Sequence, residues 1–406
     1  MAVDQTNLTP LGLRLRAALH RGASLIRAGA ERSAKASAAV NLAGLRKIHN
    51  RRPARFAVTT ATRESTLTAL LAGLAVAVLI ALPSFAGRGL LQELFYVFTM
   101  LALAQLWNLL AGCAGLISVG QQAFVGIGAY ALFAFTLMAG LEPVLAIVLS
   151  GLVAGLVAIP AALIVFRLRG AYFAIGTWVV AEVCRLILAQ VKQLGGGTGT
   201  SLPPDIVDSV VGLHVVRDLF HVRGPAARDM LSYWLALALA VGAFLLVYKL
   251  LRSRYGLALS AIGDAEDAAE STGVDVFRTK LAIYVLTAVA TGMVGALIFL
   301  QKARISPDAA FSLIDWTAYV IFSVVIGGIG TMEGPVIGVA IFYLLQDYLA
   351  ALGSWYLILL GGLAIVLMVF APEGVWGVIA HRFNISLFPV RRRLIVATAA
   401  ADERKT

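Results

Sequence analysis

Long, nearly uninterrupted runs of apolar residues dominate this chain, and short polar segments separate them. Each run is close to the roughly 20 residues that a helix needs to cross a bilayer. A membrane β-barrel would instead show alternating segments of about ten residues. The runs cover residues 67–86, 89–111, 117–140, 143–166, 171–191, 230–250, 280–300, 316–331, 335–351 and 354–371. The pattern therefore predicts an all-α polytopic membrane protein with about ten transmembrane helices.

The composition supports this class. Of the 406 residues, 60% are hydrophobic and 14% are charged, whereas a soluble domain carries about 25% charged residues. The mean hydropathy is +0.88. The two cysteines, Cys113 and Cys184, lie in or beside apolar runs and outside any Cys/His cluster. This placement favours two buried free thiols and predicts no metal site.

Positive charge concentrates before the first apolar run, where residues 1–66 hold twelve Lys and Arg against three acidic residues. This extension is too long and too charged for a cleavable signal peptide. Its Arg-, Ala- and Ser-rich composition is shared by organellar transit peptides. A cytoplasmic arm attracted to anionic lipid is the interpretation we favour, since each basic residue near such a surface contributes about 1 kcal/mol. A nucleic-acid site would need a binding motif that the extension lacks.

The distribution of Lys and Arg also orients the chain. With a cytoplasmic N-terminus, the inner segments are 112–116, 167–170, 251–279, 332–334 and 372–406, and the outer ones are 87–88, 141–142, 192–229, 301–315 and 352–353. Basic residues gather on the inner side, as the positive-inside rule requires. We therefore expect a cytoplasmic extension (1–66), a membrane domain (67–377) and a basic cytoplasmic tail (378–406), with both termini inside.

Two Gly-rich segments, 115–130 (GLISVGQQAFVGIGAY) and 326–338 (IGGIGTMEGPVIG), interrupt the apolar pattern. Irregular backbone at membrane depth survives only where protein or a water-filled cavity covers it. The segments are thus candidates for a broken helix beside a translocation path, or for close helix packing through small residues. The candidate path residues are Asn108, Ser118, Gln121, Gln122, Gly126, Gly128, Gly327, Gly328 and Gly330. Glu333-Gly334-Pro335 predicts a turn.

Glu182 and Arg185 are charged residues inside an apolar run, where an isolated charge costs several kcal/mol. Their spacing of three places them on one helical face, so we expect them to neutralise each other. They either form a structural pair between helices, which we favour, or line a path and meet the charged ends of a zwitterion.

Enzyme chemistry has little support. The sequence contains no G-x-x-x-x-G-K-[ST], H-E-x-x-H or G-x-S-x-G motif, and all five histidines fall outside the apolar runs. A self-sufficient ion-coupled carrier would usually bury more ionisable groups. We expect a transport protein that binds no cofactor and has no ATP site of its own.

The segment 263–280 (GDAEDAAESTGVDVFRTK) is a charged island on the predicted inner side. Asp264 is expected to cap a short helix, acidic residues follow in its first turn, and Gly273 is expected to end it. Ala268 and Ala269 allow close backbone approach by a partner. The alternative is an ordinary loop helix, and a short helix alone is marginal.

Here the residues resemble a known family. Asp267-Ala268-Ala269 and Gly273 are similar to the EAA-x-x-x-G signature of ABC importer permeases, although the usual following Leu-Pro is replaced by Val285-Leu286. Further blocks resemble branched-chain amino-acid permeases of the M type, with relatives that carry urea and short amides. They are NLL (108–110), AGCAGLISVGQQAFVGIGAY (111–130), RLRGAYFAIGT (167–177), GGGTGTSLP (195–203), YGLALSAIGDAEDAAESTG (255–273), ISPDAAFS (305–312), VVIGGIGTMEGPVIGVA (324–340) and MVFAPEGVWG (368–377).

The resemblance implies a type II ABC importer-like permease fold in a bacterial inner membrane. It implies a heterodimer with a sister permease, two cytoplasmic ATPases that hold ATP and Mg²⁺, and a periplasmic binding protein. Asp267, Ala268, Ala269 and Gly273, within 255–280, would couple the chain to the ATPases. Gln121 stands where many members have His, so a role of that ring does not carry over.

Overall fold

The computed structural model describes residues 55–59, 63–349, 353, 355–371, 373–383, 387–388 and 393–397. The chain forms two units: Met1–Thr59 with Arg392–Thr406, and Thr60–Arg391. In the first unit, β1 (Arg55–Thr59) pairs antiparallel with β4 (Arg393–Ala397). This pairing of the two basic terminal segments was not predicted. Most of the extension 1–66, and much of the tail 378–406, lies outside the described residues.

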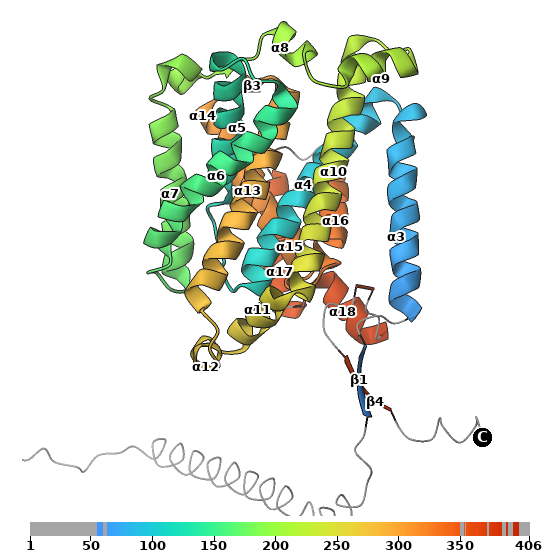
Figure 1. Cartoon of the computed structure of the whole chain (residues 1–406), viewed down its shortest axis with the longest axis vertical. Helices are drawn as coiled ribbons and strands as arrows, with labels where there is room; N and C mark the ends of the chain where they lie inside the picture. The colour runs from blue at the N-terminus through green and yellow to red at the C-terminus, as the bar shows by residue number, and fades with distance from the viewer. Residues whose placement is uncertain are drawn as a thin grey trace, which may run out of the picture. The chain divides into compact units, whose positions relative to one another are not determined.

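The second unit is a helical bundle (Figure 1). Its main helices are α3 (Arg63–Ala81), α4 (Arg88–Asn108), α5 (Gln121–Met138), α6 (Pro143–Val165), α7 (Ala171–Leu188), α10 (Gly224–Arg252), α13 (Val276–Lys302), α15 (Tyr319–Gly327), α16 (Gly334–Leu349) and α17 (Trp355–Phe370). Among the described residues, eight helical stretches are long and apolar enough to span a membrane, and Thr68–Ser84 and Gly334–Leu349 are shorter apolar helices. The predicted all-α polytopic class is confirmed.

Helix α13 lies in the centre of the bundle and packs against α5 and α6, while α10 packs along α4. The α5–α13 crossing depends on glycine: a Cβ built on Gly128 would lie 2.0 Å from the Gly292 carbonyl oxygen, and one on Gly295 would lie 2.3 Å from that of Val125. Small residues allow this close approach, and packing is what holds membrane helices together.

The bundle has two distinct ends (Figure 1). At one, the α9 end, lie the short helices α8 (Pro204–Asp208), α9 (Leu213–Phe220) and α14 (Pro307–Ala310), and the two-residue strands β2 (Thr200–Ser201) and β3 (Arg304–Ile305). At the other, the α12 end, lie α11 (Arg254–Asp264) and α12 (Glu266–Ser271). The predicted outer loop 192–229 and inner loop 251–279 therefore occupy opposite ends.

Both Gly-rich segments contain irregular backbone. Helix α4 continues as a π-helical turn, η2 (Leu109–Cys113), residues 114–120 are not helical, and α5 begins at Gln121. Helix α15 ends at Gly327, residues 328–333 are not helical, and α16 starts at Gly334. Helix breaks are therefore confirmed in both segments.

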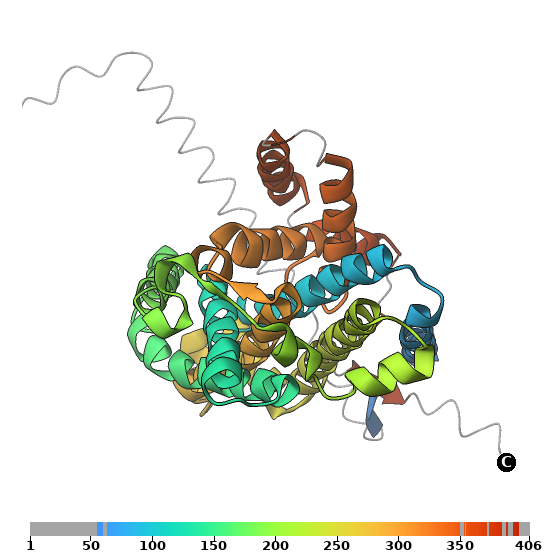
Figure 2. The same cartoon turned by 90° about the horizontal axis from the view of Figure 1, so that it is seen from above.

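The helices at the periphery of the bundle expose apolar side chains. Helices α7 and α17 bury little of their surface, and Tyr172, Ile187, Val369 and Phe370 are exposed. Viewed along the bundle, α7 and α17 stand at its edge (Figure 2). Exposed apolar helix faces of this kind suit lipid or a second membrane subunit.

Two local predictions are wrong. Helix α10 starts at Gly224, with Pro225 in its first turn, rather than at residue 230, so Asp229 belongs to a helix and not to the outer loop. Asp264 does not cap the short helix, because it is the last residue of α11; the N-cap of α12 is Ala265, which makes no side-chain hydrogen bond.

Candidate functional site

A polar clamp joins α4 to the irregular segment 328–333. Asn108 donates from Nδ2 to the Thr331 carbonyl (2.8 Å), and its Oδ1 accepts from the Gly330 N–H (2.7 Å). Gln105, one turn earlier, donates to the Met332 carbonyl (2.9 Å). These bonds satisfy backbone groups that no helix pairs, so they hold the irregular segment 328–333 against α4.

Glycine makes this clamp possible. Gly328 and Gly330 have φ values of +127° and +80°, which side chains rarely adopt. A Cβ on Gly112 would lie 2.4 Å from the Gly330 nitrogen, and one on Gly327 would lie 1.8 Å from the Gly334 carbonyl oxygen. The structure thus joins Asn108 to Gly330 and Thr331, with Gly328 in the same irregular segment and Gly327 at the neighbouring helix end.

The start of α5 forms a second buried polar group. Trp107 donates to the Ser118 carbonyl (2.8 Å), and Gln121 donates to the Leu103 carbonyl (3.1 Å). Gln122 is bound through both its backbone N–H (3.2 Å) and its Oε1 to the hydroxyl of Thr317 in η5 (Ile314–Ala318). The buried Oε1 atoms of Gln105 and Gln121 accept no hydrogen bond within the described part of the chain.

Gly126 and Gly128 occupy a different environment. A Cβ on Gly126 would lie 2.5 Å from the Phe311 ring, and Gly128 packs against Gly292. Both positions are filled by close packing of the kind that small residues allow between helices. In this conformation they contact protein on the side where their Cβ would stand.

Glu182 and Arg185 pair, as predicted. Arg185 donates from Nη2 to Glu182 Oε1 (2.6 Å) and from Nη1 to Asp308 Oδ1 (2.8 Å). The side chains of Arg185 and Glu182 are 26% and 45% exposed. The pair links the end of α7 to α14 at the α9 end, away from the polar groups of α4 and α5.

The coupling segment is anchored from inside the chain. Asp267 and Ala268 are exposed, whereas Ala269 is buried against Ile262 and Val276. Gly273 ends α12 with φ +89°, and its N–H donates to the Glu270 carbonyl (2.9 Å). The left-handed conformation explains glycine at this helix end.

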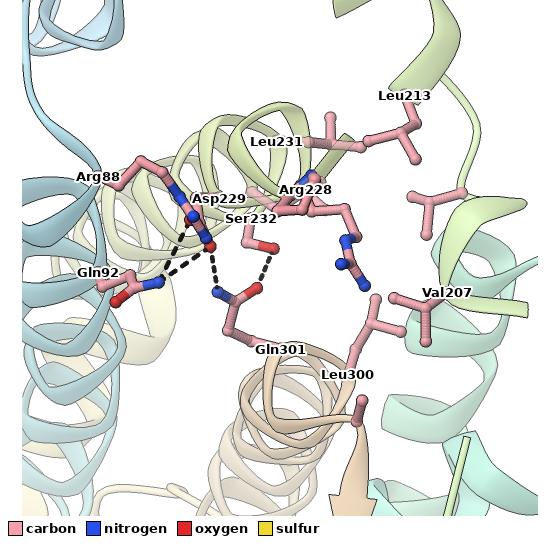
Figure 3. Close-up of a pocket in the computed structure, with 14 residues that line it drawn as sticks. Arg88, Gln92, Val207, Leu213, Arg228, Asp229, Leu231, Ser232, Leu300 and Gln301 are labelled. Carbon is pink, nitrogen blue, oxygen red and sulfur yellow. Dashed lines mark hydrogen bonds and ion pairs between the residues drawn. The ribbon is translucent and has the colours of Figure 1, made fainter. Parts of the chain in front are cut away.

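A cavity at the α9 end was missed from the sequence. It has a volume of about 200 Å³ and lies between the starts of α4 and α10, the end of α13, and the segment carrying α8 and α9 (Figure 3). Its polar wall centres on Asp229, which is 6% exposed. The signal that could have revealed it is Pro225, which favours a helix start before Asp229.

Asp229 ties three helices together (Figure 3). It accepts from Arg88 Nε (2.7 Å), from Gln92 Nε2 (3.2 and 3.3 Å) and from Gln301 Nε2 (3.0 Å). Gln301 in turn accepts from the Ser232 hydroxyl (2.6 Å). A buried carboxylate is tolerated when a cation and several donors surround it, so this network fixes one wall of the cavity.

Comparisons with known proteins agree with one another. Residues 89–370 match the family described as branched-chain amino acid transport system / permease component. The high-affinity branched-chain amino acid transport system permease protein LivM of Salmonella typhimurium is 28% identical over 318 residues, covering 75% of this chain and 73% of that protein. LivM of Escherichia coli is 27% identical over 308 residues, covering 73% and 72%. The ribose import permease protein RbsC of Bacillus subtilis is 32% identical over 133 residues, covering 31% and 41%. No solved structure matches.

Proposed function

Since this chain belongs to the branched-chain amino acid transport system permease family, we propose that it is the membrane-spanning subunit of an ATP-driven importer for branched-chain or other hydrophobic amino acids. The observation that carries the proposal is the family match over 89–370, which includes almost the whole bundle. The ligand would be delivered by a periplasmic binding protein, and the partner subunits would supply ATP hydrolysis with Mg²⁺.

The α12 end is the proposed contact with the ATPases. Asp267 and Ala268 are exposed there, and α12 is only six residues long, so it depends on neighbouring contacts for its position. Ala269 packs on Val276, and Glu266 pairs with Lys280 of α13. Movement of α12 would therefore be transmitted to the central helix α13.

The α9 end would receive the delivered ligand. Loops 192–229 and 301–315 are the proposed contacts with the binding protein, and Glu182 and Arg185 would shape that end. The polar groups around Asn108, Ser118, Gln121 and Gln122, with Gly126, Gly128, Gly327, Gly328 and Gly330, would form or gate the path. Two gated ends of one bundle suit alternating access in the bacterial inner membrane, with both termini in the cytoplasm.

A sister permease would complete the path. The exposed apolar faces of α7 and α17 would contact an apolar neighbour, which is either lipid or a membrane-embedded protein subunit. In such an arrangement the chain would have at least four partners: the sister permease, the two ATPases and the binding protein.

The test is ATPase stimulation in the reconstituted complex with a panel of ligands on the binding protein. Leucine, isoleucine or valine should stimulate hydrolysis, and urea, acetamide or ribose should not. Stimulation by urea or acetamide, without stimulation by the amino acids, would favour a permease for urea and short amides. Uptake by the chain alone, driven by an ion gradient, would favour a secondary carrier and overturn the proposal.

A further inference from the structure

The cavity at the α9 end has two chemically different halves. Val207, Val210 and Leu213 come from the segment with α8 and α9, and Leu231 and Leu300 complete an apolar wall. The opposite wall is polar and contains Arg88, Asp229, Ser232 and Gln301. Arg228 lines the same cavity (Figure 3). A small ligand with an aliphatic part and a charged part would match both halves.

Arg228 is the cation best suited to meet such a ligand. Arg88 is committed to Asp229 at 2.7 Å, whereas Arg228 reaches Asp208 only at 3.8 Å, with Asp208 59% exposed. An exposed pair at that separation contributes little, so Arg228 can exchange it for a carboxylate at small cost. Its guanidinium offers two parallel donors to a carboxylate.

The rest of the polar wall supplies no free charge. Arg88 and Asp229 cancel in charge, and both carboxylate oxygens of Asp229 already accept hydrogen bonds. Arg228 therefore leaves the polar half with a net positive charge that attracts a carboxylate. The Asp229 network ties α4, α10 and α13 together, so this wall is formed before a ligand arrives.

The size of the cavity limits the ligand. Pockets for drug-sized molecules span about 300–1,000 Å³, and this one has about 200 Å³. Six Val and Leu side chains line it, and they would remove a branched aliphatic side chain from water. We propose that this cavity is an entry site for an aliphatic amino acid. Arg228 binds its carboxylate, and the apolar wall described above contacts its side chain.

This inference rests on the proposed function for its place in transport, but binding can be measured without it. The probe is thiol protection of Val207→Cys in a Cys113→Ser, Cys184→Ser background, within the assembled complex. Leucine should slow modification. 4-Methyl-2-oxopentanoate, which keeps the carboxylate, should protect partly, whereas isoamylamine, which lacks it, and ribose should not protect.

Arg228→Gln should raise the leucine concentration for half-protection by about tenfold or more, because charge-assisted bonds to a carboxylate are lost. Arg217→Gln is the matched control: Arg217 lies in α9 and also pairs loosely with an exposed aspartate, at 3.7 Å. It should leave protection unchanged. Arg228→Lys should recover part of the affinity.

Equal protection in Arg228→Gln and the parent would overturn the site, as would protection by ligand-free binding protein alone. If leucine protects Val207→Cys but ATP drives no leucine uptake, the site stands and the proposed function fails. If uptake depends on ATP and leucine never protects, the proposed function stands and the site is wrong.

Discussion

The Lys280 ammonium forms an ion pair with the Glu266 carboxylate, so the start of α13 is tied to the start of α12. Lys280 is 13% exposed and Glu266 53%. Together with the contact of Ala269 on Val276, the pair makes α12 an attachment to the central helix and not a free loop. Because α13 packs on α5 and α6, a push on α12 would reach the bundle core.

Removing this pair should uncouple hydrolysis from transport. Lys280→Met should lower the amount of leucine moved per ATP while the ATPases stay bound, because a partly exposed pair contributes only about 0.2–1 kcal/mol to folding. Lys249→Met, at an exposed lysine of the same end, is the control. The charge swap Glu266→Lys with Lys280→Glu should recover coupling. An unchanged transport-to-ATP ratio in Lys280→Met would refute this link.

Adjacent alanines of α12 should respond differently to the same change. Ala269 is buried, so Ala269→Leu overpacks its cluster and should cost about 1–3 kcal/mol in stability. Ala268 is exposed, so Ala268→Leu should leave the melting temperature unchanged and weaken ATPase co-purification. Thermal unfolding and pull-down on both variants separate the effects. Normal ATPase binding by Ala268→Leu would show that this face is not the docking surface.

Asn108 should be required for the clamp on residues 328–333. Asn108→Ala leaves the Gly330 N–H and the Thr331 carbonyl without their partner, at about 1–3 kcal/mol for each buried unsatisfied group. Asn108→Asp keeps an acceptor for Gly330 but places an oxygen against the Thr331 carbonyl in a buried position, so it should also lose stability. Thermal unfolding in detergent measures both. Equal stability of Asn108→Ala and the parent protein would mean that the clamp does not hold this loop.

Gly128 should tolerate no side chain. Gly128→Ala places a methyl group against the Gly292 carbonyl, forces α5 and α13 apart, and should lower stability by about 1–3 kcal/mol. Gly242 is the matched helical control, since a Cβ there meets nothing within 4 Å. Gly242→Ala should be neutral or stabilising by up to about 1 kcal/mol. Similar melting temperatures for the two variants would contradict the packing.

Hydropathy located the membrane helices well because each apolar run is a local property of the sequence. It misplaced the start of α10, since the first turns of that helix carry Arg228 and Asp229, whose charges resemble a loop. Capping preference placed Asp264 at the start of α12, whereas it is the last residue of α11, because a good capping residue can equally end the preceding helix. Such boundaries are decided by tertiary contacts, which outweigh local preference.

The candidate sites were predictable only in part. Gly273 and the pairing of Glu182 with Arg185 follow from local spacing. The partners of Asn108 and Gly128 lie more than 150 residues away along the chain, at Gly330 and Gly292. The cavity beside Asp229 needs residues from α4, α10 and α13 in one place. No periodicity in a single sequence contains that information.

The most direct test of the central claim is uptake of labelled leucine by proteoliposomes that contain this chain, its sister permease and the two ATPases. We expect uptake only when ATP and Mg²⁺ are on the side of α12 and leucine-loaded binding protein is on the side of α9. Uptake that needs neither ATP nor binding protein, or that follows an imposed ion gradient, would contradict the account.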